Sequence, residues 1–178
     1  MVALLLIPLL VVPGQIAFAQ DDVQVFDDRI YKLGVGDRLR VTVYNEIDLS
    51  GEFDVGPAGT VNLPLIGEVA AQGRTIPEVE DAAEELFLQG YLKSPSVSIE
   101  VLNYRPFYIL GEVNSPGSYP FVNGMTVLNA VALAGGFTYR ASEGSVLLKR
   151  EGATAEVSVA IDTPVLPGDV LTVEERFF

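Results

Sequence analysis

The stretch from residue 107 to 140 constrains the fold most, because apolar runs and turn signals follow one another there in a fixed order. Residues 107–113 are rich in aromatic and β-branched side chains, which favours a strand. The Asn-Ser-Pro-Gly sequence at 114–117 favours a turn, since proline presets φ and glycine tolerates positive φ. Residues 118–122 are therefore expected to return as a second strand, with Pro120 at an edge or bulge because it has no amide hydrogen.

A short amphipathic helix is predicted to follow this hairpin. Thr126 is placed to cap its first turn, because a threonine hydroxyl accepts a hydrogen bond from an amide that the helix start leaves unpaired. Gly135 and Gly136 end the helix, since one of them can adopt the left-handed conformation that closes many helices. The large apolar residues of this helix are Val127, Leu128, Val131 and Leu133.

Two motifs in this stretch carry a resemblance to a known family. One is L-G-E-V-x-x-P-G-S-Y from Leu110, and the other is M-T-V-L-N-A-V-A-L-A-G-G-F-T from Met125, followed by Arg140-Ala141. In this order they resemble the soluble-ligand-binding β-grasp (SLBB) module of bacterial polysaccharide export proteins. The resemblance implies a β-grasp fold for this part of the chain and a role in polysaccharide export.

A Gly-Asp turn and an alternating strand open the preceding part of the chain. Tyr31 to Asp37 precede Leu39, Val41 and Val43, whose spacing of two predicts a half-buried strand. The pattern Y-x-L-G-x-G-D-x-L-x-V-x-V resembles the opening of the polysaccharide export domain. In that family the domain continues into a P-L-I-G stretch, which is present here at 64–67.

The remainder of this domain is predicted to contain short strands and one helix. Residues 52–55 and 60–65 flank a glycine- and proline-containing turn. Thr75 and Glu78 form a capping-box pattern at the start of a helix that runs to about Gln89. Its inward face is expected to carry Ile76, Val79, Ala83 and Leu86. The alternating segment 96–101 is expected to close the domain.

The chain is therefore expected to be an α+β protein of two small mixed domains. The polysaccharide export domain is assigned to residues 31–103 and the SLBB β-grasp domain to residues 104–178. Tyr104-Arg105-Pro106 is expected to be the hinge between them, because proline pushes the residue before it out of helix.

Three more strands are predicted in the second domain. Residues 146–150 and 157–161 flank a Glu-Gly turn, and 166–173 form the last strand segment. This last segment repeats the Gly-Asp turn and alternating strand of residues 33–43. We interpret the repetition as reuse of one turn in two places.

The N-terminus is predicted to direct export. Residues 2–12 are nearly all apolar, and Ala17-Phe18-Ala19 has the small-x-small pattern that signal peptidase reads. The run is shorter than the roughly 20 residues that a transmembrane helix needs. We expect a signal peptide at 1–19, cleaved after Ala19, and a flexible lead-in at 20–30.

Composition excludes several classes of function. The chain has 24 acidic and 11 basic residues, a formal net charge of -13, and neither cysteine nor histidine. Such an excess of carboxylates repels nucleic acid, so no nucleic-acid partner is expected. Disulfides, cysteine nucleophiles and thiolate or imidazole metal sites are excluded by residue type. No metal and no cofactor are therefore expected.

Carboxylates are the main catalytic groups that this composition leaves. Glu46 and Asp48 follow the first strand and are the pair to consider for glycoside hydrolysis, although solvated loop carboxylates explain them better. The glutamates of the predicted helix at 76–89 are interpreted as a solvated face. Asp37 and Asp169 are expected to cap local backbone amides instead of binding a metal.

The resemblance implies a non-enzymatic ring subunit in the periplasm, associated with the outer membrane, that forms part of the conduit for a capsular polysaccharide or exopolysaccharide. The implied partners are further copies of the chain in a cyclic homo-oligomer, the polysaccharide, an inner-membrane chain-length regulator (co-polymerase), and a separate outer-membrane pore protein. The residues expected to hold loop shapes at module and subunit contacts are Gly34, Gly36, Asp37, Pro64, Gly67, Gly111, Glu112, Pro116, Gly117, Gly135 and Gly136.

Two alternatives remain open from the sequence. One is a monomeric periplasmic module that binds or senses carbohydrate. The other is a carboxylate-dependent glycosidase or lyase that uses Glu46 or Asp48. The size of the protein in solution separates the first alternative from a ring subunit, and release of reducing ends from the polysaccharide tests the second.

Overall fold

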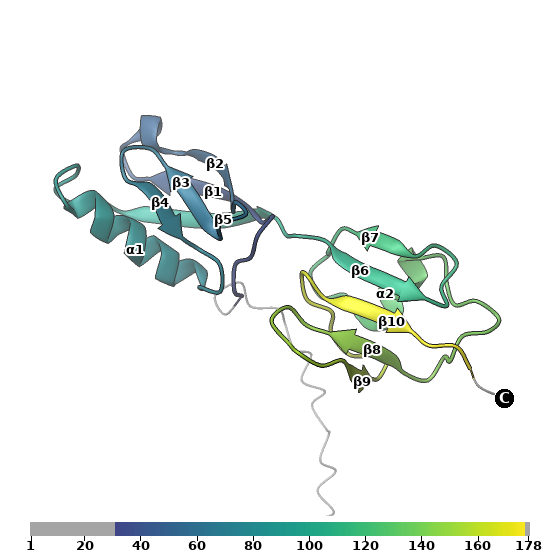
Figure 1. Ribbon diagram of the computed structural model, residues 1–178. Helices are drawn as coiled ribbons and strands as arrows, with labels where there is room; N and C mark the ends of the chain where they lie inside the picture. Colours follow the sequence, from purple (N-terminus) through teal and green to yellow (C-terminus); the bar gives the residue numbers. More distant parts are fainter. Residues whose placement is uncertain (1–30, 177–178) are drawn as a thin grey trace, which may run out of the picture.

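The computed structural model describes residues 31–176 and shows two units of mixed helix and sheet, each with its own hydrophobic core. The predicted signal peptide and lead-in lie outside the described residues. Figure 1 shows the two units side by side, joined by the short segment between β5 and β6. No helix among residues 31–176 is long and apolar enough to cross a membrane.

The first unit is built on a three-stranded antiparallel sheet. Strand β1 (Arg38–Val43) lies between β2 (Gly51–Asp54) and β5 (Val97–Asn103). As predicted, Leu39, Val41 and Val43 are buried. A separate hairpin of β3 (Thr60–Leu63) and β4 (Gly67–Ala70) packs with them, and a 3-10 turn, η1 (Ile47–Leu49), follows β1.

The helix of this unit, α1 (Ile76–Leu88), begins as the sequence predicts. Glu78 Oε2 accepts a hydrogen bond of 2.7 Å from the Thr75 amide, the back half of a capping box. Its buried face carries Ile76, Val79, Ala83 and Phe87. Leu86, expected on this face, is only partly buried, because the Phe87 ring fills that position in the core.

The glutamates of α1 do more than form a solvated face, so that prediction is wrong for two of them. Glu84 Oε1 accepts a hydrogen bond from the Val97 amide at 2.8 Å, and Glu80 Oε1 accepts one from the Ile99 amide at 2.7 Å. These amides lie on β5, which is an edge strand of the sheet. The helix therefore covers a strand edge with carboxylates, which protects it from pairing with another chain.

The second unit is a five-stranded sheet in the order β7-β6-β10-β8-β9. Its central strand β10 (Val170–Val173) runs parallel to β6 (Phe107–Gly111) and antiparallel to β8 (Val146–Lys149). The edges are β7 (Gly117–Tyr119) and β9 (Val157–Val159), both shorter than predicted. Strand β7 ends before Pro120, as expected for a residue that cannot donate to a ladder.

Helix α2 (Val127–Leu133) packs on one face of this sheet (Figure 1). Thr126 caps it as predicted, because its Oγ1 accepts a hydrogen bond from the Asn129 amide. Gly135 and Gly136 both have positive φ, 81° and 88°. The apolar side chains of the helix divide between two faces: Val127 and Val131 are buried, but Leu128 and Leu133 are half exposed.

Candidate functional site at the junction of the two domains

The two Gly-Asp turns that the sequence repeats have the same geometry. Asp37 Oδ2 accepts a hydrogen bond of 2.8 Å from the Gly34 amide, and Asp169 Oδ2 accepts one of 2.8 Å from the Leu166 amide. The glycine before each aspartate has positive φ, 93° at Gly36 and 82° at Gly168. Both aspartates cap local amides, as predicted, and both turns lie at the junction of the domains.

Asp37 is the most densely bonded carboxylate of the junction. Its side chain is 0% exposed. Oδ2 accepts hydrogen bonds from Tyr31 Oη at 2.7 Å and Arg105 Nη1 at 3.1 Å, in addition to the Gly34 amide. Oδ1 accepts one from the Arg105 amide at 2.9 Å. A buried carboxylate is stable when it is paired and fully hydrogen-bonded in this way.

Arg105 connects the two domains. Besides Asp37, its Nη1 donates to the Tyr31 hydroxyl, and its guanidinium lies over the Tyr31 ring. Its Nη2 forms an ion pair of 2.7 Å with Glu151 Oε2, in the turn between β8 and β9. Glu151 also accepts a long hydrogen bond of 3.5 Å from Gln72 Nε2 of the first domain.

Aromatic packing holds the same segment from the other side. The Tyr104 ring meets the Tyr31 ring edge-on at 5.1 Å and the Phe121 ring at 5.5 Å. Tyr104 packs against both hydrophobic cores. The connecting segment, which the sequence analysis names as the hinge between the domains, is therefore bonded on both sides.

Two glycines make room for the Arg105 side chain. A Cβ at Gly34 would lie 2.4 Å from Arg105 Cζ, and one at Gly168 would lie 2.7 Å from Arg105 Nε. Real Cβ atoms do not approach other atoms so closely, so any side chain at either position displaces the guanidinium. The two turns therefore form a slot for one arginine.

Burial sets the electrostatics of the junction. Desolvation raises the pKa of the Tyr31 hydroxyl above its usual value, and the Asp37 carboxylate raises it further. Desolvation also raises the pKa of Asp169 to about 6, although the Leu166 amide, Arg150 and Arg105 act in the opposite direction. Tyr31 therefore stays protonated as a donor, whereas Asp169 loses its proton near neutral pH.

A second group of predicted residues lies at the opposite end of β6 and β10. A Cβ at Gly111 would lie 2.1 Å from the Val173 carbonyl oxygen. Glu112 Oε2 accepts a hydrogen bond of 2.5 Å from Thr138 Oγ1. The hairpin turn is bonded to the end of α2, because the Asn114 amide donates to the Gly136 carbonyl at 3.0 Å. Gly111, Glu112, Gly135 and Gly136 are thus brought together, away from the junction.

The remaining predicted residues lie elsewhere. Pro64 is in the turn of the β3–β4 hairpin and Gly67 is the first residue of β4; Leu65 and Gly67 have positive φ, 69° and 72°. Pro116 and Gly117 are in the β6–β7 hairpin, and a Cβ at Gly117 would make only an ordinary 3.9 Å contact with the Tyr119 ring. None of the hydrogen bonds and glycine contacts described above for the junction involves Pro64, Gly67, Pro116 or Gly117.

Sequence reasoning missed four residues of the junction, namely Tyr31, Gln72, Arg105 and Glu151. Tyr31 belongs to the quoted opening motif, but its bonding role has no sequence signal. Arg105 is a single cation between two domains, and its carboxylate partners lie 68 and 46 positions away. Two signals in the sequence indicate this place: the repeated Gly-Asp turn, and the hinge predicted at Tyr104-Arg105-Pro106, although neither gives the bonds that Arg105 makes.

The carboxylates weighed for catalysis lie at the short 3-10 turn after β1. Glu46 precedes η1 and Asp48 is exposed within it. A groove of about 490 Å³ beside α2 is lined by Val122, Asn123, Gly124, Met125, Asn129, Ala132 and Leu133, none of which is ionisable. Among residues 31–176 no three acidic side chains gather as metal ligands would.

Comparison with known proteins divides the chain at this junction. The model of the polysaccharide biosynthesis/export protein family matches residues 27–102, and that of the SLBB domain matches residues 106–161. The chain is similar to exopolysaccharide production protein ExoF of Rhizobium meliloti (strain 1021), with 41% identity over 129 residues, which are 64% of this chain and 30% of that protein. It is also similar to polysialic acid transport protein KpsD of Escherichia coli, with 28% identity over 123 residues, which are 67% of this chain and 22% of that protein. The chain thus aligns with less than a third of either relative.

Proposed function

Because this chain belongs to the bacterial polysaccharide export protein family and carries an SLBB module, we propose that it is a non-enzymatic subunit of a periplasmic ring through which an exopolysaccharide or capsular polysaccharide leaves the cell. The observation that carries this proposal is the pairing of an export domain with an SLBB domain in one chain. The domains are assigned to residues 31–103 and 104–178, after a signal peptide at residues 1–19 and a lead-in at 20–30.

The junction supports this function through rigidity. A ring keeps a passage of fixed width only if each subunit holds its two domains in one arrangement. Arg105 provides this by bonding Asp37 of the export domain and Glu151 of the SLBB domain at once. The acidic surface of the chain would bind an acidic or neutral polymer weakly, and weak binding lets the polymer slide.

The relatives point to the same class of cargo. ExoF is named for exopolysaccharide production and KpsD for polysialic acid transport. We propose that the subunit acts at the outer membrane with a separate pore protein and receives polymer from an inner-membrane chain-length regulator. The loop glycines at 34, 36, 67, 111, 117, 135 and 136 would hold the shapes of domain and subunit contacts.

Deletion of the gene in its own host tests the proposal. We expect secreted polysaccharide to be lost and to return with the intact gene. The purified chain should sediment as an oligomer with one dominant size. Normal secretion by the deletion strain, or enzymatic release of reducing ends by the purified chain, would overturn the proposed function.

A further inference from the structure

Two segments of the first domain meet at the end that lies away from the junction. Strand β1 ends there at Val43, which lies opposite Val97 at the start of β5. Helix α1 ends at the same place, because Glu84, about one turn before its last residue, accepts a hydrogen bond from the Val97 amide. In Figure 1 this end is the left-hand side of the molecule. We call residues 44–50 and 88–96 together the tip.

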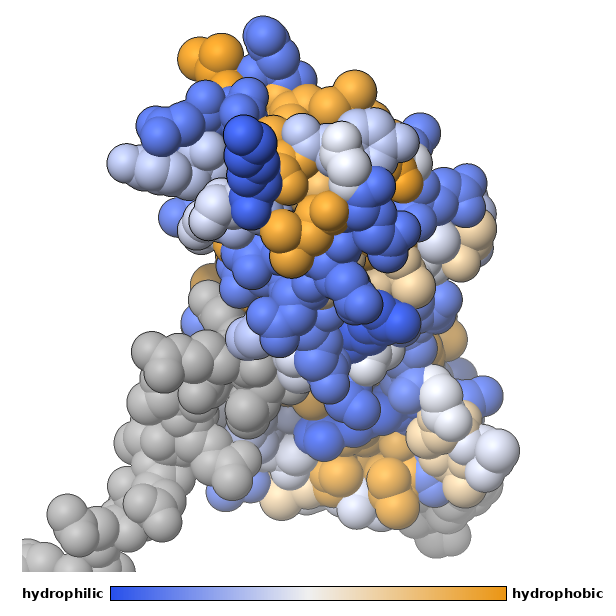
Figure 2. Space-filling model, turned by 90° about the vertical axis from the view of Figure 1, so that its left-hand side faces the viewer, coloured by the Kyte–Doolittle hydropathy of each residue, from blue (hydrophilic) through white to orange (hydrophobic). Residues whose placement is uncertain are grey.

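Four large apolar side chains project from the tip. Tyr44 and Ile47, from its first segment, are 72% and 86% exposed. Leu88 and Tyr91, from its second segment, are 55% and 52% exposed. They are four of the six large apolar side chains that are exposed among residues 31–103. Figure 2 looks onto this end of the domain and shows apolar side chains together in its upper half, bordered by hydrophilic ones. Apolar side chains that gather at one end of a folded domain indicate a binding surface.

The turn that carries Ile47 is fixed from beneath. Ser50 Oγ accepts a hydrogen bond of 2.9 Å from the Val43 amide and donates one of 2.8 Å to the Glu46 carbonyl. Leu49, at the end of the same turn, is buried in the core of the first domain. These bonds hold the backbone on both sides of Ile47, so its side chain points to solvent as a consequence of the turn itself.

The tip is nearly balanced in charge, although the whole chain has a formal net charge of -13. Its charged side chains are Glu46, Asp48 and Lys93. Within residues 31–176, Lys93 forms no ion pair with another side chain. The tip therefore presents an ammonium group and two carboxylates beside its apolar side chains.

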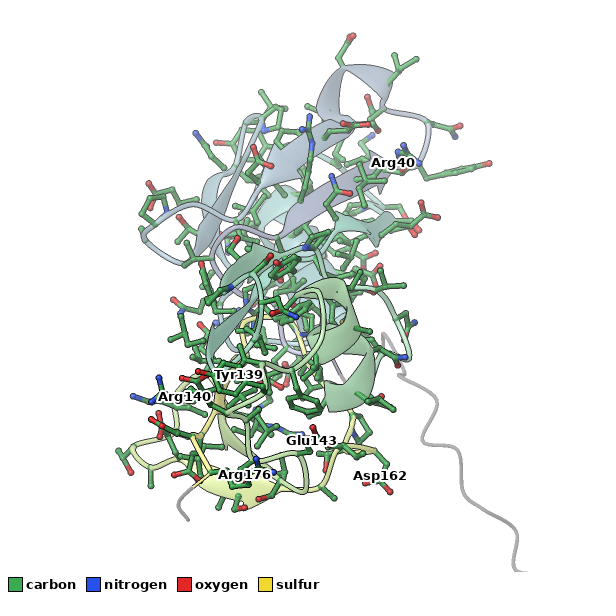
Figure 3. The ribbon with its side chains drawn as sticks, turned by 90° about the vertical axis from the view of Figure 1, so that its right-hand side faces the viewer. Arg40, Tyr139, Arg140, Glu143, Asp162 and Arg176 are labelled. Atoms are coloured by element: carbon green, nitrogen blue, oxygen red, sulfur yellow. The ribbon has the colours of Figure 1, made fainter. Side chains whose placement is uncertain are left out.

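Cations elsewhere in the molecule do not supply a surface for anionic lipid. Arg40 is paired with Glu52 on the first sheet, and Arg140 is paired with Glu175. Figure 3 shows Arg140 and Arg176 at the lower end of the second domain and Arg40 in the first domain, so these cations are not gathered at one place. Because binding to an anionic membrane relies on clustered lysine and arginine, attraction of the chain to a membrane must come mainly from apolar side chains.

A lipid surface suits the tip better than a folded protein does. A stable protein interface uses roughly 20–30 residues on each side in close complementarity, whereas the tip offers a few apolar side chains on protruding segments. Lipid yields to such protrusions, and tyrosine is enriched where hydrocarbon meets headgroups. The Lys93 ammonium complements a lipid phosphate, and the carboxylates of Glu46 and Asp48 complement the ammonium group of a zwitterionic headgroup.

We propose that the tip inserts its apolar side chains, Ile47 foremost, into the surface of a bilayer of zwitterionic phospholipid. Insertion reaches the boundary between headgroups and acyl chains and goes no deeper, since no helix among residues 31–176 is long and apolar enough to cross. The export domain then faces the membrane, and the second domain lies on the side away from it. This inference rests on the proposed function only for the periplasmic location, which brings the chain to a membrane surface.

A fluorescent label at residue 47 tests insertion directly. The chain has no native cysteine, so Ile47→Cys can carry a single nitrobenzoxadiazole group, whose emission depends on its surroundings. Vesicles of phosphatidylcholine and phosphatidylethanolamine should shift this emission to shorter wavelength, and brominated lipids should quench it. Val157→Cys, at a 60% exposed position of β9 in the second domain, is the matched control and should show neither change. An unchanged spectrum at residue 47, or an equal response at residue 157, would overturn the inference.

Polar substitutions measure how much the apolar side chains contribute to lipid binding. In flotation with the same vesicles, Ile47→Ser should raise the lipid concentration needed for half-maximal binding by about tenfold. Leu88→Ser should raise it by less, because a smaller part of that side chain is exposed. Val157→Ser is the control and should float as the unaltered chain does. Circular dichroism should show the native fold in all three variants, since the replaced side chains are exposed. Unchanged flotation of both tip variants would refute insertion of the tip.

Lipid composition tests the choice of headgroup. Adding phosphatidylglycerol makes the vesicles anionic and should weaken binding, because the chain has a formal net charge of -13. Lys93→Gln should weaken binding to the zwitterionic vesicles, whereas Lys149→Gln, an exposed lysine of the second domain, should not. Binding that grows with phosphatidylglycerol and persists in Ile47→Ser would show that another, electrostatic surface holds the membrane, and the inference would be wrong.

Secretion separates this inference from the proposed function. If the unaltered chain does not bind the vesicles, the tip is not a lipid-binding surface, but loss of secreted polysaccharide on deletion of the gene would still support the proposed function. Normal secretion by the deletion strain would refute the proposed function, whatever the vesicles show. Tip variants that bind vesicles normally but fail to restore secretion would assign the tip to a protein partner and overturn the lipid assignment.

Discussion

Arg105 Nη2 lies 2.7 Å from Glu151 Oε2, and this ion pair joins the segment between the domains to the turn between β8 and β9. The same guanidinium faces Asp37 through Nη1 at 3.1 Å. The two partners differ in their surroundings, since the Asp37 side chain is 0% exposed and that of Glu151 is 43% exposed. One arginine thus makes a buried ion pair to the first domain and a half-exposed one to the second.

Removing the arginine charge should destabilise the protein far more than removing its exposed partner. Arg105→Gln leaves the buried Asp37 carboxylate without its cation, which typically costs about 3–5 kcal/mol. Glu151→Gln breaks only the half-exposed pair, which is worth about 1 kcal/mol or less. Urea unfolding followed by circular dichroism gives both free energies of unfolding. Equal losses for the two variants would contradict this division.

Asp169 should make stability fall as pH rises. Its pKa in the folded chain is raised to about 6 from the ordinary 3.8. Between these values the folded chain keeps a proton that the unfolded chain has released, so the contribution of this group is complete below pH 3.8 and is lost as pH passes 6. Asp169→Asn keeps an oxygen for the Leu166 amide but removes the titration. Relative to the unaltered chain, the variant should gain up to roughly 3 kcal/mol between pH 4 and pH 7.

Urea unfolding at several pH values measures this gain. Glu156→Gln, at an exposed position of the same domain, is the control and should give a constant difference across the range. A constant difference for Asp169→Asn as well would show that the buried aspartate has an ordinary pKa.

Local signals in the sequence predict much of the fold. The features that they do not predict depend on residues that lie far apart in the sequence. The alternation of Leu39, Val41 and Val43, and the caps at Thr75 and Thr126, depend on neighbours within one turn or strand, and each is found as expected. The role of Arg105 depends on residues that only tertiary structure brings near. Arg105 lies in a connecting segment, where no periodic pattern of apolar residues surrounds it. The sequence near Arg105 therefore does not indicate which residues it binds.

The sequence also fails to predict which side of α2 is exposed, for a related reason. A helix of two turns presents too few residues for its apolar period to separate a core side from an outer side. Leu128 and Leu133 therefore looked like the core residues Val127 and Val131. Similarly, the glutamates of α1 have the pattern of a solvated face, and only the position of β5 shows that two of them bind strand amides.

Those two glutamates should stabilise the sheet edge. Glu84→Ala leaves the Val97 amide without its carboxylate acceptor, which should lower the free energy of unfolding by about 1–2 kcal/mol. Hydrogen exchange at the Val97 amide should also accelerate. Glu85→Ala, on the exposed side of the same helix, is the matched control and should change stability by less than about 0.5 kcal/mol. If exchange at Val97 is unaffected by Glu84→Ala, the carboxylate does not protect the edge.

Substitution of Gly111 and Gly67 by alanine distinguishes two possible costs of an added Cβ: the cost of positive φ and the cost of steric overlap with a neighbouring atom. Both have positive φ, 82° and 72°, so alanine at either position incurs a conformational cost of about 1–2 kcal/mol. A Cβ at Gly67 meets nothing within 4 Å, whereas one at Gly111 would lie 2.1 Å from the Val173 carbonyl oxygen. That oxygen accepts a hydrogen bond of 3.0 Å from the Glu112 amide, so displacing it also disturbs the end of the parallel β6–β10 pair.

Gly67→Ala should therefore lower the free energy of unfolding by about 1 kcal/mol, and Gly111→Ala by more than about 3 kcal/mol. Chemical denaturation of both variants measures the difference. Because the conformational cost is common to both positions, the excess at Gly111 reports the steric overlap alone. Losses of the same size would mean that β6 and β10 separate easily enough to admit a methyl group, and the close approach at Gly111 would then not explain why glycine stands there.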